Sequence, residues 1–242
     1  MYSRCAIKFN DIEIDKEING YMTVNVEGRQ LFSPTLETLE VPGRNGDICI
    51  GKQYSSRDIK VYFLIEAERN VDFLKKIKRL TEILQTTNEV EFKFRDEDGV
   101  RFGQVSEVEG PPYDSNIGIG SFTIHSSDPF LYTNIKQSNG IIPTLKYKKY
   151  HIKIESLEVT GAASSSLQLL NKSNGQKIII NEKLVSTDKV LITKDTITKN
   201  GINILNKLDF VTSDYHEFEA YSGDSITVSS GNVTINYRER VL

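Results

Sequence analysis

Apolar and polar residues alternate with a period of two in the first third of the chain. The segment GYMTVNVEG (20–28) alternates, and IKVYFLIEAE (59–68) is rich in β-branched and aromatic residues. The first pattern puts Tyr21, Thr23 and Asn25 on one strand face and the intervening apolar residues on the other. The second is typical of a well-buried strand. Both segments therefore predict β-strands.

A helical pattern follows over residues 71–85. Its apolar residues recur at helical spacing, as Phe73, Ile77, Leu80 and Leu84. Asn70 stands where a helix N-cap is expected. The cluster KKIKR (75–79) is interrupted by the apolar stripe, which favours a solvated or subunit-facing helix surface over a phosphate site.

The order of the remaining elements indicates the class of the first domain. EVEFKF (89–94) and VRFGQVSEVEG (100–110) alternate on either side of Asp98-Gly99, a hairpin signal. A closing strand begins at residue 119. Strands, one long helix, a hairpin and a strand predict an α+β domain of mostly antiparallel strands over residues 1–133.

Residues 134–242 predict a different architecture. A linker-like stretch (133–144) leads into short strand patterns, with turn signals such as Asn174-Gly175, Asn200-Gly201 and Ser230-Gly231 between them. No helical pattern is visible. This spacing predicts an all-β sandwich.

Charge differs between the two predicted domains. Residues 1–133 carry 22 acidic and 16 basic side chains, a net −6, and residues 134–242 carry 11 and 14, a net +3. Neither part has the strong positive charge of a nucleic-acid-binding domain. The basic and aromatic segment KYKKYHIK (146–153) alternates like a first strand, which we favour over a single-strand binding site.

Motifs of catalysis and cofactor binding are absent. There is no phosphate-binding loop, dinucleotide fingerprint, nucleophile elbow or Cys/His cluster, so we expect no enzyme, cofactor or metal site. Cys5 and Cys49 lie in strand-like apolar contexts and are expected to be buried free thiols. The N-terminus lacks a secretory signal and the apolar runs are too short to span a bilayer, so we expect synthesis in the host cytoplasm and no membrane partner.

Five motifs in order resemble one known family. They are VPGRNGDICIGKQYSSRDIKVYFLI (41–65), the helix NVDFLKKIKRLTEILQ (70–85), EVEFKFRDEDGVRFGQVSEVE (89–109), SFTIHSSDPFLY (121–132) and the C-terminal YSGDSITVSSGNVTINYRERVL (221–242). Together they resemble the distal tail proteins of siphophages, over nearly the whole chain.

The resemblance implies a structural function. In that family the first domain forms a six-membered ring that continues the tail tube, and the second is an outward-projecting sandwich of galectin-like or carbohydrate-module-like type. The ring is a hub in the virion tail that joins the tube, the tail-associated tip protein and, where a baseplate exists, receptor-binding proteins. The family is typical of phages and prophages of Gram-positive bacteria. The alternative is a carbohydrate-binding adhesion module, which the absence of tryptophan disfavours.

Two sets of candidate site residues follow. Arg44, Asn45 and Gly46, in the PGRNG loop, are candidates for contact with a neighbouring subunit, because a guanidinium between two glycine-containing bends can pair with a carboxylate in bidentate fashion. A plain surface loop is the alternative.

The second set concerns the channel of such a ring. DNA must pass through it without specific binding, and affinity for a duplex rises with each phosphate that a basic residue neutralises. The acidic excess of the first domain therefore favours carboxylates facing the channel, with Asp11, Glu13 and Glu27 as candidates. Alternatively, the excess is spread over the outer surface for solubility.

Overall fold

The computed structural model describes residues 3–30, 33–146 and 148–241. The chain divides into two compact units, of which unit 1 extends through Leu131 and unit 2 comprises Tyr132–Val241. Each unit has its own apolar core. That residues 1–133 and 134–242 are separate domains stays a prediction.

Unit 1 is built on a seven-stranded sheet in the order β2-β1-β7-β8-β9-β6-β3, and every neighbouring pair is antiparallel. Its strands are β1 (Ile7–Phe9), β2 (Ile12–Glu13), β3 (Tyr21–Glu27), β6 (Arg57–Glu66), β7 (Val90–Phe94), β8 (Arg101–Glu109) and β9 (Ile117–Ser126). The predicted hairpin of residues 89–110 is confirmed as β7 and β8, with Val90 opposite Gly103 and Phe92 opposite Arg101.

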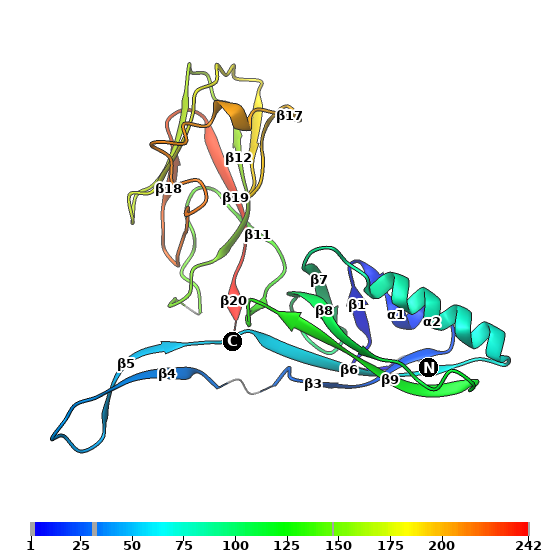
Figure 1. The fold of residues 1–242 in the computed structure, drawn as a ribbon. Coiled ribbons are helices and arrows are strands. Elements are labelled where there is room, and N and C mark those ends of the chain that lie inside the picture. Colours follow the sequence, from blue (N-terminus) through cyan, green and yellow to red (C-terminus); the bar gives the residue numbers. More distant parts are fainter. Residues whose placement is uncertain (1–2, 31–32, 147, 242) are drawn as a thin grey trace. The chain divides into compact units, whose positions relative to one another are not determined.

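The central strand β6 shows why the sheet has one buried face. Ile59, Val61, Phe63 and Ile65 are at most 1% exposed, while the three residues between them point to the other face and are partly exposed. The buried face packs against α2 (Asn70–Leu84), which lies along it in Figure 1, and the short α1 (Ile14–Glu17) adds Ile14 to the same core.

The predicted helix is confirmed as α2, with Phe73, Leu80, Ile83 and Leu84 buried. The proposed cap is wrong. Arg69 occupies the N-cap position without a side-chain cap bond, and the Asn70 amide instead donates to the carbonyls of Tyr113 and Ser115, at 3.0 and 2.9 Å. Asn70 therefore ties the start of α2 to the loop before β9.

In β3, a bulge between Thr23 and Asn25 interrupts the alternation. Tyr21 and Thr23 are buried, Val24 is 49% exposed, and Val26 packs against the core. The extra residue in a bulge shifts which side chains face inward. The alternation predicted from the sequence is therefore interrupted at Val24, and the inward-facing positions differ before and after this residue.

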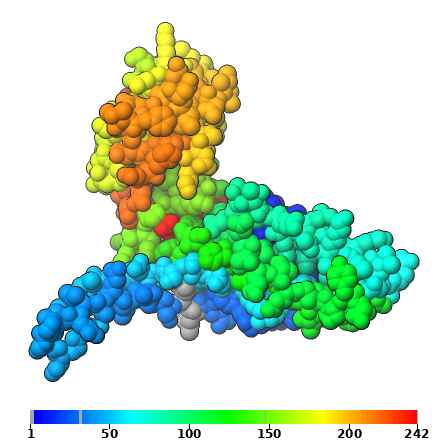
Figure 2. All heavy atoms as spheres, in the orientation of Figure 1, coloured from blue at the N-terminus to red at the C-terminus, as the bar shows by residue number. Residues whose placement is uncertain are grey.

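Two further strands of unit 1 stand apart from this sheet. Among the described residues, β4 (Thr35–Glu40) and β5 (Asp47–Gln53) pair only with each other, in an antiparallel ladder with a bulge between Glu37 and Thr38. We call residues 35–53 the arm. Figure 1 shows the arm extending away from α2, and Figure 2 shows it as a slender projection.

Unit 2 consists mainly of two antiparallel sheets, with orders β11-β19-β12-β15-β16-β17 and β14-β13-β18. The strands are β11 (Lys136–Ser138), β12 (Lys153–Thr160), β13 (Leu167–Asn171), β14 (Lys177–Ile180), β15 (Lys189–Ile192), β16 (Ile197–Lys199), β17 (Ile202–Asn203), β18 (Ile226–Val228) and β19 (Asn232–Arg238). A separate short ladder pairs β10 (Leu131–Tyr132) with β20 (Arg240–Val241).

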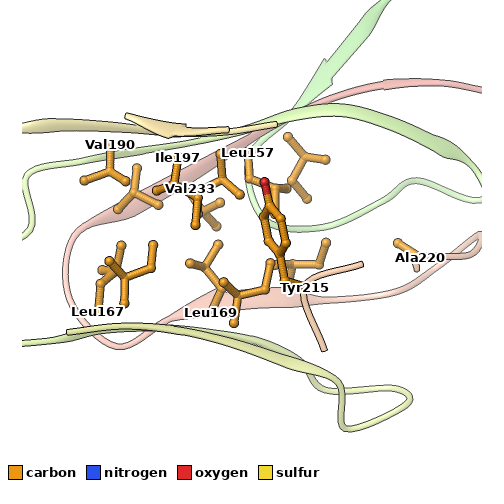
Figure 3. Close-up of a cluster of buried hydrophobic side chains, with 14 of the residues drawn as sticks. Leu157, Leu167, Leu169, Val190, Ile197, Tyr215, Ala220 and Val233 are labelled. Carbon is orange, nitrogen blue, oxygen red and sulfur yellow. The ribbon is translucent and has the colours of Figure 1, made fainter. Parts of the chain in front are cut away.

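The core of unit 2 lies between its sheets. In Figure 3, Leu157, Val190 and Val233 face Leu167 and Leu169, and all five are at most 7% exposed. The single-turn 3-10 helix η1 (Leu205–Lys207) was not predicted, and β11 lies within residues 133–144, which were expected to be a linker. The mostly antiparallel β character is confirmed, whereas the likeness to galectins or carbohydrate modules stays a prediction.

Candidate assembly surfaces

The arm exposes apolar side chains on both strands. Leu39 of β4 lies opposite Ile48 of β5, and Ile50 occupies the bulge beside them. Leu39 is 51% exposed and Ile50 64% exposed. A two-stranded hairpin without a third layer is at best marginally stable in water. The arm thus presents apolar surface and two open strand edges that nothing in the described part of unit 1 covers.

The PGRNG loop forms the tip of the arm. Asn45-Gly46 does not make a two-residue hairpin turn, because β4 ends at Glu40 and β5 begins at Asp47. The six-residue connection includes a hydrogen bond from Arg44 N to Val41 O of 3.1 Å. Gly43 and Gly46 both have left-handed φ angles, 83° and 77°, which favour glycine. Arg44 and Asn45 are exposed between these bends.

At the other end, the base of the arm is anchored in unit 1. The rings of Tyr54 and Phe130 meet edge to face at 6.0 Å, and Lys52 lies over the Tyr54 ring at 5.3 Å. Next along the chain, Arg57 is buried and donates to the Arg29 carbonyl at 3.0 Å. The base therefore has tertiary contacts that the tip lacks.

The second surface is the face of the sheet that points away from α2, across β3, β6, β9 and β8. We call it the open face. Its register brings Glu27, Lys60, Thr123 and Glu107 into one row across the four strands. Five carboxylates occur on the open face, with a single lysine, Lys60, among the described residues: Glu27, Asp58, Glu66, Glu107 and Glu109.

Hydrogen bonds hold part of the open face in place. Ser121 Oγ donates to the Glu109 carboxylate at 2.6 Å, and Lys60 approaches the same group at 3.0 Å. The Ser121 hydrogen bond and then Lys60 lower the pKa of Glu109. Tyr62 donates to Glu27 at 3.1 Å. The contacts of Glu109 favour its ionised form. With five carboxylates and one lysine, the described part of the open face carries a net negative formal charge.

The predicted channel residues do not lie together. Glu27 is on β3, at one edge of the sheet, whereas Glu13 is on β2, at the other edge, and Asp11 is in the turn before it. Lys8 contacts Asp11 at 2.6 Å, and Lys16 pairs with Glu13. These lysines lower the pKa of each carboxyl and offset its charge. Of the three, only Glu27 lies on the open face. Sequence reasoning missed Glu107 and Glu109, although their alternation in VSEVE places them on one face.

Three further observations concern metal ions, histidine and membrane spans. No group of three or more histidine, cysteine or acidic side chains there could hold a metal ion. His125 contacts Asp58 at 2.7 Å as an exposed cross-strand pair. None of the described helices has the length and apolar character to cross a bilayer.

Both cysteines are free, but one expectation about them is wrong. Cys5 is partly buried, whereas Cys49 is exposed. Cys49 lies on β5, opposite Thr38 of β4. Because the arm has only two strands and no covering layer, its strand-like apolar context does not produce burial.

Each of the two units matches the model of a known protein family. Residues 12–125 match the family model of the phage tail protein RIFT-related domain, and residues 150–240 match that of the siphovirus-type tail component, C-terminal domain. The C-terminal Leu242 of the family-like ending lies outside the described residues. No curated protein matches the chain in sequence.

Solved structures show the same fold. The crystal structure of the Dit protein of phage SPP1, described as a paradigm of the hub adsorption apparatus in phages that infect Gram-positive bacteria, has a TM-score of 0.72 at 15% identity, over 98% of this chain and 99% of that one. Two structures of the phage p2 baseplate in its activated conformation also match. The structure with Sr has a TM-score of 0.63 at 12% identity, over 92% of this chain and 91% of that one. The structure with Ca has a TM-score of 0.59 at 12% identity, over 90% of each chain.

At identities of 12–15% the solved structures show only that the fold is shared. The assignment of this chain to a family rests on the two family models. They account for most of each unit, in the order expected for a tail hub. The carbohydrate-binding alternative gains no support from them. The chain belongs to the siphophage distal tail proteins, a family of phage tail components.

Proposed function

We propose that this protein forms a ring of six subunits at the end of a siphophage or prophage tail tube, without catalytic activity. The ring joins the major tail tube protein to the tail-associated tip protein and, where a baseplate exists, to receptor-binding proteins. Unit 1 forms the ring, and unit 2 projects outward as a galectin-like sandwich. Synthesis takes place in the cytoplasm of the bacterial host.

The observation that carries this proposal is the arm. Natural proteins rarely leave a two-stranded ladder with open edges and exposed apolar side chains uncovered, because such an edge pairs readily with another chain. A contact between the arm of one copy and a different surface of the next copy is heterologous. Heterologous contacts close into rings when the rotation between copies permits it. Arg44, Asn45 and Gly46 at the arm tip are the proposed contact residues.

The open face supports the second part of the proposal, in which DNA passes through the channel without being held. In a ring lined by this face, the five carboxylates repel the phosphates of a duplex, and the single Lys60 is engaged with Glu109. Glu27 keeps its proposed place in the channel lining. Asp11 and Glu13 stay candidates, although their paired lysines weaken their contribution.

Removal of the arm tests the proposal. A variant in which residues 36–52 are replaced by a short glycine-serine linker should remain folded, since the core residues of both units lie outside the arm. We expect light scattering with size-exclusion chromatography to give a ring for the full chain and a monomer for the variant. A full chain that stays monomeric, or an armless variant that still forms rings, contradicts this account.

A further inference from the structure

Five asparagines in the chain are followed directly by glycine, and each of these glycines has a left-handed φ angle. Asparagine before glycine is prone to deamidation in water, because glycine has no Cβ to hinder its backbone nitrogen. The reaction needs an asparagine carboxamide that can turn toward the next residue and a glycine N–H that can reach it. The surroundings of each pair therefore decide whether it reacts. The five asparagines are Asn19, Asn45, Asn139, Asn174 and Asn200.

Hydrogen bonds fix two of these asparagines in the turns of unit 2. The Asn174 amide donates to Gln176 Oε1 at 2.9 Å, and its Oδ1 accepts from the Gln176 N–H at 3.0 Å. The Gly175 N–H donates to a backbone carbonyl at 2.9 Å. Asn200 donates to Asp188 at 2.8 Å and accepts from a backbone N–H at 2.9 Å. Both carboxamides would have to give up these bonds before reacting.

Backbone packing holds the glycines of two further pairs. The Gly20 carbonyl accepts from the Glu66 N–H at 2.9 Å, and a Cβ added to Gly20 would collide with the Glu66 carbonyl. Gly140 is buried, and its carbonyl accepts from the Ile226 N–H at 2.7 Å. Because these segments lie against a neighbouring strand, the glycine nitrogen is not free to swing toward the preceding side chain.

The remaining pair, Asn45-Gly46 at the arm tip, has neither restraint. Both residues are exposed, and no hydrogen bond within the described chain engages the Asn45 side chain or the Gly46 N–H. A Cβ added to Gly46 would meet no described atom within 4 Å, apart from its chain neighbours. The ladder ends at Glu40 opposite Asp47, and like charges in that position destabilise it. The tip is therefore free to make the backbone rotation that the reaction needs.

We propose that Asn45 is a site of spontaneous deamidation, and that its product competes for the neighbouring Arg44. The Gly46 nitrogen attacks Asn45 Cγ and forms a C–N bond. The Cγ–Nδ2 bond breaks, and the amide leaves as ammonia with the proton from the Gly46 nitrogen. One water then opens the resulting succinimide ring. Opening at Cγ gives aspartate, whereas opening at the backbone carbonyl gives isoaspartate, in which the side-chain carbon has entered the main chain.

Either product changes the charge of the arm tip. Residues 40–47 contain one cation, Arg44, and two carboxylates, Glu40 and Asp47, and the reaction adds a third carboxylate next to Arg44. A carboxylate is the partner that a guanidinium binds best. The product therefore competes with the carboxylate of a neighbouring subunit for Arg44. This consequence rests on the proposed ring, and it makes unassembled subunits lose assembly competence as they age.

Peptide mapping tests the site. In the folded full chain, kept in warm and mildly alkaline buffer, Asn174 and Asn200 should react at least about tenfold more slowly than Asn45, which corresponds to a barrier about 1.4 kcal/mol higher. Digestion after glutamate at acidic pH gives peptide 41–66, in which Asn45 is the only asparagine. Mass spectrometry after chromatography measures its aspartate and isoaspartate forms.

Unfolding provides the matched control. In urea, all five pairs should react at similar rates, because the surroundings that distinguish them are lost. If Asn45 reacts no faster than Asn174 in the folded chain, the proposal is overturned.

The variant Gly46→Ala tests the role of the glycine nitrogen. It should fold, since the loop lies outside both cores and the added Cβ has space, although the φ of 77° strains an alanine. The reaction should slow at Asn45 and stay unchanged at the other four asparagines. Direct hydrolysis of the amide would give aspartate alone. An unchanged rate in Gly46→Ala, or a product without isoaspartate, overturns the mechanism.

The variant Asn45→Asp tests the consequence for assembly, because it carries the product's charge from the start. Its ring fraction in size-exclusion chromatography should be lower than that of the unmodified chain. Asn206→Asp, an exposed change in unit 2, is the control and should leave the ring fraction unchanged. Equal ring fractions in the two variants refute the competition for Arg44. An unmodified chain without rings refutes the proposed function, whereas the mass measurement decides the modification of Asn45 in either case.

Discussion

Lys60 of β6 reaches across β9 to Glu109 of β8, and their charged atoms lie 3.0 Å apart. This contact engages the one lysine found on the open face among the described residues. In the proposed channel, the remaining carboxylates would therefore determine how that face interacts with DNA. The acidity of the open face results from the sheet register, which brings together carboxylates as far apart in the sequence as Glu27 and Glu109.

Charge reversal on the open face should give a ring that binds duplex DNA, whereas the unmodified ring should not bind it. With Asp58→Lys and Glu107→Lys, we expect duplex binding at 50 mM salt that falls by at least about 10³-fold at 200 mM, because each new lysine neutralises phosphate charge. A gel-shift titration measures this. Asp114→Lys, an exposed loop change outside these strands, is the control and should leave binding absent. Tight duplex binding by the unmodified ring would contradict an acidic lining.

The core contact of α2 makes a stability prediction. Leu80 is 3% exposed within the core of unit 1, so Leu80→Ala should lower the free energy of unfolding by about 2–5 kcal/mol. Val71, on the same helix, is 62% exposed, and Val71→Ala should change stability by less than about 0.5 kcal/mol. Denaturant titration of both variants checks the pair, and similar costs would mean that α2 does not pack as described.

The arm tip makes a prediction about assembly rather than stability. Arg44 is exposed and belongs to neither core, so Arg44→Ala should weaken ring formation while leaving the unfolding midpoint of the monomer nearly unchanged. Arg44→Lys keeps the charge but loses bidentate pairing, and should give an intermediate loss. Sedimentation velocity at matched concentrations measures the ring fraction. If the ring fraction of Arg44→Ala equals that of the unmodified chain, the loop is an ordinary surface loop without a role in assembly.

Acid should weaken unit 2 through Asp188. The Val185 N–H donates to this carboxylate at 2.9 Å and the Asn200 amide at 2.8 Å, and these hydrogen bonds, with Lys199, lower its pKa from the ordinary 3.8. A carboxyl with a lowered folded-state pKa contributes stability that is present above pH 3.8 and is lost as the pH falls through the folded value.

The variant Asp188→Asn isolates that contribution. Its thermal midpoint should lie below that of the unmodified protein at pH 7, and the gap should close as the pH falls below about 4. Calorimetry of both proteins from pH 7 to pH 3 gives the comparison. A gap that stays constant across this range would show that the charge of Asp188 is not the source of the difference.

The helix and the hairpin of unit 1 could be predicted because each buries one face. Phe73, Leu80 and Leu84 recur at helical spacing since α2 has a single apolar stripe against the sheet. The β7–β8 hairpin has period-two alternation for the same reason. Its turn, however, lies at Arg95-Asp96 rather than at the expected Asp98-Gly99. Local burial therefore left a periodic pattern that sequence alone could reveal.

The arm and the composition of the open face could not be predicted in the same way. β4 has leucines at 36 and 39, three positions apart, because neither of its faces packs against unit 1 and no period of two results. Asp11, Glu13 and Glu27 were expected to share a surface as carboxylates of the early strands, but β1 pairs with β7 while β3 pairs with β6. Strand order depends on long-range pairing, which local pattern does not encode.

The central claim is that this distal tail protein assembles into a closed ring through the arm. Electron microscopy of the purified protein, with two-dimensional class averages, tests it most directly. This account predicts rings with six-fold symmetry and a central channel for the full chain, and isolated subunits after arm replacement. Isolated subunits in both samples at every concentration used would contradict it.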